Sequence, residues 1–138
     1  MAIKHNRFHP YSPFWVGALF ATLTAITIPW NLYLAFKLPP NNLSNHWDVA
    51  WVGFDIGLSL AIATTAWLAI IKSKYLIMAA TITATMLVMD AWFDVITAHK
   101  GYDFIQSMVL AFFCEIPLAF VTYRLAYTIL KHDFKGKR

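Results

Sequence analysis

The chain is short, strongly apolar and weakly charged. Of its 138 residues, 59% are hydrophobic and 13% are charged, and the formal net charge is +4. Soluble domains contain about 45–50% apolar and about 25% charged residues, so the composition predicts an integral membrane protein. About four helical spans of roughly 20–25 residues would use nearly the whole chain, which excludes a separate soluble enzyme domain within it. The single cysteine, Cys114, excludes an intramolecular disulfide.

Four apolar runs follow one another along the chain, and each is long enough to cross a membrane as a helix. The first, 14–36, ends at a Pro-Pro-Asn-Asn loop, and the second, 47–71, ends at Lys-Ser-Lys. The third, 75–98, ends at His-Lys-Gly, and the fourth, 103–130, continues into a basic tail. None shows the period-2 alternation of a barrel strand. The sequence therefore predicts an all-α polytopic membrane protein, with residues 1–138 forming a single domain of four transmembrane helices in an antiparallel bundle.

The distribution of basic residues predicts which side of the membrane each chain end occupies. Eight of them fall on the side that would hold both termini, and two fall on the other side. Lysine and arginine are enriched in cytoplasmic loops, so both termini are expected to be cytoplasmic. The larger set is Lys4, Arg7, Lys72, Lys74, Lys131, Lys135, Lys137 and Arg138, and the smaller set is Lys37 and Lys100.

Four of the seven acidic residues lie well inside the apolar runs, at least four residues from either end. A charged side chain at the bilayer centre costs about 2.5–3.5 kcal/mol on insertion scales, so residues of this kind usually mark a functional site. Counted at about 1.5 Å per residue, they all fall in the outer half of the membrane: Asp55, Asp90, Asp94 and Glu115. Asp90 and Asp94 are one helical turn apart and share a face. We therefore expect one acidic site that is open to the extracytoplasmic side.

Neutral polar and aromatic residues are expected to complete this site. Asn31 lies in the outer half of the first run, and Ser59 lies one turn from Asp55 in the second. Both are predicted to be uncharged ligands. Trp51 and Trp92 could hold an organic cation against their aromatic faces.

Helix breakers and small residues predict two further features. Pro117 closely follows Glu115, and a proline inside a span frees a backbone carbonyl about one turn earlier, near Phe113. Gly53 and Gly57 form a G-x-x-x-G pattern, which predicts that their face packs closely on another helix.

Neighbouring carboxylates inside a membrane need bound protons or a cation among them. Oxygen ligands suit Na⁺, Ca²⁺, Mg²⁺ or Mn²⁺, so the same four acids are the candidate metal ligands, while a proton relay requires no cofactor. Zinc is disfavoured because no H-x-x-x-H or C-x-x-C spacing occurs. Two aspartates from different helices could share a proton as in an aspartyl protease, but no accompanying catalytic motif supports an enzyme.

The leading hypothesis for function is therefore binding and transport of a cation or proton. The alternative is a membrane sensor, receptor or accessory subunit that binds a small cationic or lipid-like ligand without transporting it. The expected partners are the lipid bilayer and a second copy of the chain in a homodimer, and no nucleic acid. Arg124 is expected either to extend to the cytoplasmic headgroups or to close the inner end of the acidic site.

Three motifs of the WVGFD, DAWFD and EIPL types carry a family resemblance. They occupy His46–Asp55, Asp90–Thr97 and Glu115–Leu118. In these motifs the chain resembles a group of small four-span bacterial membrane proteins from Gram-positive genomes that have no assigned activity. The resemblance covers about residues 14–130 and implies a multi-pass protein of the bacterial plasma membrane whose motifs centre on the four acids. It implies no substrate or catalytic residue.

Overall fold

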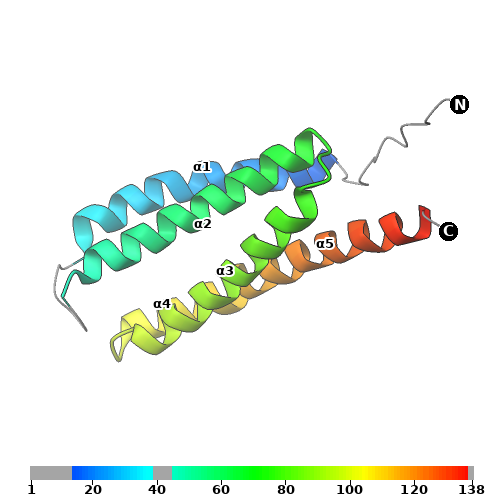
Figure 1. The fold of residues 1–138 in the computed structure, drawn as a ribbon. Coiled ribbons are helices and arrows are strands. Elements are labelled where there is room, and N and C mark those ends of the chain that lie inside the picture. Colours follow the sequence, from blue (N-terminus) through cyan, green and yellow to red (C-terminus); the bar gives the residue numbers. More distant parts are fainter. Residues whose placement is uncertain (1–13, 39–44, 137–138) are drawn as a thin grey trace, which may run out of the picture.

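The computed structural model describes residues 14–38 and 45–136, and the side chains among them up to residue 131 (Figure 1). All regular structure in these ranges is helical, as predicted. Four helical spans are long and apolar enough to cross a membrane. They are α1 (Phe14–Lys37), α2 (Trp47–Ile70), α3 (Leu76–Thr97) and a fourth span made of α4 (Tyr102–Leu110), η1 (Ala111–Glu115) and α5 (Ile116–Gly136). The fold class is thus all-α, and the chain is compatible with a multi-pass membrane protein.

Several residues used to predict topology lie outside the described part. They are Lys4 and Arg7, the loop residues from Pro39 to Ser44, and the basic side chains after Lys131. Helix α2 is followed by a tight turn. In this turn Lys72 adopts a left-handed φ of 51°, and the Ser73 amide donates to the Leu68 carbonyl at 2.9 Å. This turn reverses the chain into α3.

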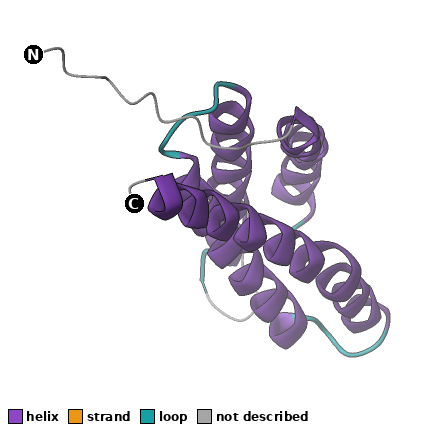
Figure 2. Ribbon diagram, turned by 90° about the vertical axis from the view of Figure 1, so that its right-hand side faces the viewer, coloured by secondary structure: helices purple, strands orange, loops and turns teal. Residues whose placement is uncertain are grey.

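The helices pack in series (Figures 1 and 2). Helix α1 packs against α2, α2 packs against α3, and α3 packs against all three segments of the fourth span. Within the described residues, the backbones of α1 and α5 do not approach each other closely. Neighbouring helices run in opposite directions, so that the beginning of α1 and the end of α5 lie at the same end of the molecule. We call this the terminal end, and we call the end where α2 begins the opposite end.

The apolar core lies in the half of the molecule nearer the terminal end. It is formed by Val16, Phe20, Leu58, Ile62, Ala66, Ala69, Leu76, Ala80, Leu87, Ala119, Leu125, Ala126 and Ile129. The many alanines let the backbones approach closely, which is how membrane helices gain packing energy when lipid is as apolar as the core.

Among the described glycines, the one in the tightest surroundings is one that the sequence pattern did not single out. A Cβ added to Gly17 of α1 would lie 2.8 Å from Cγ1 of Ile70 in α2. By contrast, a Cβ added to Gly53 would have nothing within 4 Å, and one added to Gly57 would meet Met86 at an ordinary 3.5 Å. The expectation that the Gly53–Gly57 face packs closely is therefore wrong for Gly53, because this stretch of α2 lies where the helices are less tightly packed.

The fourth span changes its hydrogen-bonding pattern at Glu115. Segment η1 is a π-helical turn, in which the Ile116 amide donates to the carbonyl of Ala111, five residues earlier. Pro117 has no amide hydrogen, and in an α-helix its ring would crowd the carbonyl of Phe113. A wider turn relieves that crowding without ending the helix. The predicted disturbance near Phe113 is present, and its form is one extra residue in the turn that carries Glu115.

Candidate functional site

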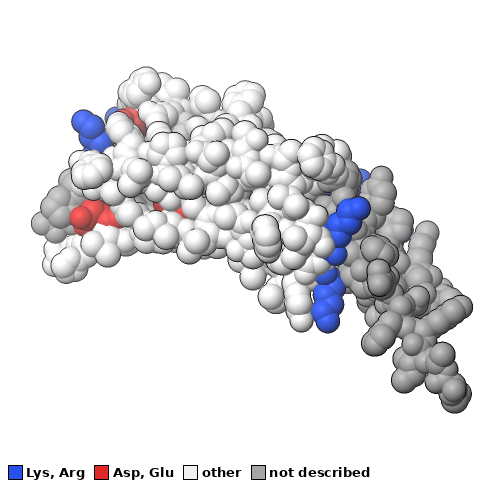
Figure 3. All heavy atoms as spheres, turned by 90° about the horizontal axis from the view of Figure 1, so that it is seen from above, with Lys and Arg blue, Asp and Glu red and all other residues white. Residues whose placement is uncertain are grey.

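The four acidic residues predicted to form the site come from three consecutive spans. Asp55 lies in α2, Asp90 and Asp94 lie in the second half of α3, and Glu115 ends η1. Because α3 packs against both α2 and η1, it brings the other two acids to its own pair. Figure 3 shows acidic side chains gathered toward one end of the molecule and most of the basic ones toward the other, with an uncharged surface between them. We call Asp55, Asp90, Asp94 and Glu115 the acidic group.

The members of the acidic group lie close enough for their charged forms to repel one another. Asp94 acts electrostatically on Asp55, Asp90 and Glu115, and Asp55 acts on Asp90 and Glu115 as well. Glu115 in turn acts on Asp90. The fold therefore brings the four acids into one region, although they are up to sixty positions apart in the sequence.

Two members of the group are held largely away from solvent. The side chain of Asp90 is only 9% exposed, which is unusual for a carboxylate in any protein. The Oε2 atom of Glu115 is buried and has no hydrogen-bond partner in the described part of the chain. Buried polar atoms are nearly always hydrogen-bonded, and the exceptions often mark a functional group or a missing ion or water. Asp55 and Asp94 are partly exposed, so the group also has access to the surface.

The predicted neutral ligands meet beside Asp55. The side-chain amide of Asn31 in α1 donates to the hydroxyl of Ser59 in α2 at 2.9 Å. Ser59 is one turn from Asp55 and shares its face. This bond fixes α1 to α2 beside the acidic group, so α1 contributes a polar side chain to the surroundings of the site without contributing an acid.

The two predicted tryptophans differ in their positions. Trp51 of α2 packs edge-to-face on Phe93 of α3, with ring centroids 6.3 Å apart, and so bridges the two helices that carry aspartates. Trp92 is two residues from both Asp90 and Asp94, which turns it to roughly the opposite side of α3. Its side chain is 62% exposed. The structure does not bring Trp92 to the acidic group.

A buried hydroxyl pair lies deeper in the protein, and the sequence analysis did not identify it. Thr65 of α2 and Thr83 of α3 are fully buried, and their hydroxyls are 2.9 Å apart. Thr83 is seven residues before Asp90 on the same face of α3. Thr65 lies on a different face of α2 from Asp55, so helical phase does not lead from that aspartate to this threonine. The adjacent threonines Thr64 and Thr65 in an apolar helix were the available signal.

A preformed metal chelate is not present in the described part of the chain. No three or more Asp, Glu, His or Cys side chains there are arranged so that they could hold a metal ion together. The acids are thus near enough to interact electrostatically but are not directed at one common point. This arrangement suits protons, or one cation bound by few protein ligands, better than a divalent ion that needs several carboxylates.

Comparison of the chain with protein-family models, with curated proteins and with solved structures finds no match. The functional argument therefore depends on the residues themselves: an all-helical protein with four apolar spans, and an acidic group within those spans.

Proposed function

We propose that the chain binds and transports a proton or a small cation through the acidic group, which opens to the extracytoplasmic side. The single observation that carries this proposal is the buried Oε2 atom of Glu115, which has no hydrogen-bond partner among the described residues. Its segment packs against the helix that carries the nine-tenths buried Asp90. Carboxyl groups in such surroundings are costly to charge. A proton or a cation bound among them removes that cost.

The topology and location follow as part of the same proposal. The four helices form an antiparallel bundle in a bacterial plasma membrane, with both termini in the cytoplasm. The excess of basic residues at the terminal end supports this orientation. The acidic group would then receive its ligand from outside, through the partly exposed Asp55 and Asp94.

A second candidate, a sensor or receptor that does not transport, is favoured by one observation. The apolar core lies between the acidic group and the terminal end. In this conformation it separates the acids from the side that would be cytoplasmic. Transport requires this core to open in a second conformation, whereas a sensor needs only to bind its ligand.

Proton flux into liposomes distinguishes the two candidates. The full chain is reconstituted, an inward pH gradient is imposed, and internal pH is followed with an entrapped dye, with a parallel Na⁺ gradient as the cation arm. Asp90→Asn keeps the size of the side chain but removes its titrating group. We expect it to reduce uptake roughly a hundredfold, as for other lost proton-transfer groups.

The matched control is Asp103→Asn, which changes an exposed aspartate in the first turn of α4. It should leave uptake unchanged. Infrared difference spectra on acidification test binding separately, because a protonated carboxyl gives its own carbonyl band. A wild-type protein without flux, whose carboxyl band is lost in Asp90→Asn, would establish the sensor. Equal flux in the wild type and Asp90→Asn would exclude the acidic group from both functions.

A further inference from the structure

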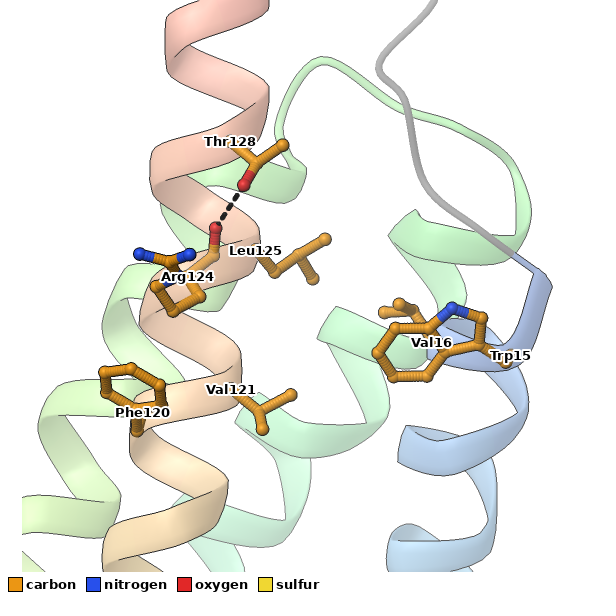
Figure 4. Close-up of a pocket in the computed structure, with 7 residues that line it drawn as sticks. All are labelled: Trp15, Val16, Phe120, Val121, Arg124, Leu125 and Thr128. Carbon is orange, nitrogen blue, oxygen red and sulfur yellow. Dashed lines mark hydrogen bonds between the residues drawn. The ribbon is translucent and has the colours of Figure 1, made fainter.

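A second candidate site lies at the terminal end, between the first and last helices of the series. Here the described backbones of α1 and α5 do not approach each other closely, and a groove of about 310 Å³ lies between the two helices (Figure 4). Small-molecule sites begin at about this size. Val121 and Leu125 project from α5 toward Trp15 and Val16 of α1, so the walls are hydrocarbon and aromatic.

One cation adjoins this groove, with its charged end turned away from α1. Among the described residues that line it, only Arg124 is charged. Its guanidinium is 5.9 Å from the centre of the Phe120 ring, on the side of α5 farther from α1. Thr128 also lines the groove, but its hydroxyl donates to the Arg124 carbonyl at 2.8 Å and is therefore occupied. Glu115 lies nine residues earlier, about 13 Å away along the helix, too far to neutralise the arginine.

More positive charge continues from Arg124 toward the terminal end. Lys131 is exposed and lies two turns farther along the same face of α5. Lys72 and Lys74, in the turn between α2 and α3, are exposed at the same end. An arginine at the edge of an apolar groove, with further basic residues beyond it, matches one type of membrane component: a molecule with a long hydrocarbon chain and an anionic head.

We propose that this groove binds an anionic phospholipid, with an acyl chain against its apolar walls and the phosphate on Arg124. The planar guanidinium can donate two parallel hydrogen bonds to phosphate oxygens. The lipid fills the space that a direct contact between α1 and α5 would otherwise occupy. It thereby connects the two ends of the helix series and the two sides of the apolar core.

Native mass spectrometry of the delipidated full chain tests the proposal. The protein is titrated with phosphatidylglycerol and with phosphatidylcholine of identical acyl chains. We expect the anionic lipid to be retained more strongly, and Arg124→Gln to lower its affinity about fivefold, to the level of the zwitterionic lipid. Lys100→Gln removes an exposed charge at the opposite end, away from the groove, and it should retain the anionic lipid fully.

Val121→Trp tests the apolar part of the groove and keeps every charge. It should reduce retention of both lipids, and it remains informative if Arg124→Gln fails to fold. Three outcomes would overturn the proposal. These are unchanged retention in both groove variants, displacement of the lipid by millimolar inorganic phosphate, and loss of a dimer in Val121→Trp without loss of lipid. The last result would assign the groove to a second copy of the chain.

Discussion

The two halves of this molecule differ in how they are packed. In the half nearer the terminal end, α1, α2, α3 and α5 together bury an apolar core. In the other half, no described side chain is buried in residues 21–37, 47–57, 92–97 and 102–110. That half contains Asp55 and Asp94 and is fixed by single contacts, such as the bond from Asn31 to Ser59.

This difference shows where stability and chemistry are located. A close-packed interior resists change because each side chain is held by many neighbours. A loosely packed region with few buried apolar contacts opens at a lower free energy and can admit water or ions. The acidic group lies at the boundary, with Asp90 buried and its other members partly exposed. The following substitutions test whether the halves differ as strongly as their packing indicates.

The largest effect on stability is expected from a cavity in the packed half. Ile62 is 2% exposed at the centre of the core, so Ile62→Ala removes contacts that the surroundings cannot replace. We expect the free energy of unfolding in mixed detergent micelles to fall by about 2 kcal/mol, which is the low end of the range for core truncations in soluble proteins. The loss is at the low end because the unfolded side chain is surrounded by lipid or detergent instead of water. Leu60→Ala is the control, since Leu60 is 63% exposed and should lose little. Equal losses would mean that the core is not close-packed in the membrane.

An intermediate effect is expected from overpacking between α1 and α2. Gly17→Ala would place a methyl group 2.8 Å from Cγ1 of Ile70, a branched side chain with little rotamer freedom. We expect a loss of about 1–2 kcal/mol in the free energy of unfolding. Gly53→Ala makes the same change where nothing lies within 4 Å, and it should be neutral or stabilising by up to about 1 kcal/mol. The comparison fails if Gly53→Ala is the more harmful substitution.

The smallest effect is expected from the two polar contacts, one in each half. Double-mutant cycles with Thr65→Val and Thr83→Val, and with Asn31→Ala and Ser59→Ala, measure the coupling free energy of each pair. The buried threonine pair should couple by about 1 kcal/mol and the half-buried amide–hydroxyl pair by about 0.5 kcal/mol or less, within the range for membrane helices. Stronger coupling between Asn31 and Ser59 would show that the open half is more rigid than its exposure indicates.

Much of the architecture could be predicted from the chain, because each apolar run must satisfy its backbone hydrogen bonds internally in lipid and so forms a helix. The free-energy cost of a charged side chain in the membrane likewise identified the acidic group without any coordinates: Asp55, Asp90, Asp94 and Glu115. Helical phase related residues within one helix, such as Asp90 to Asp94. It could not relate Thr65 to Thr83, since their contact depends on the rotation of α2 against α3.

The amino-acid sequence alone is therefore enough to predict four apolar helices. It also identifies the acidic residues within them as candidates for a functional role. Both predictions follow from local composition and from the free-energy cost of placing a charged side chain in the bilayer. Three features are visible only in the folded chain. The helices pack in series, Gly17 rather than Gly53 makes the close contact, and a π-turn carries Glu115. Each depends on how far apart and how rotated two helices are, and many distant side chains set those quantities together.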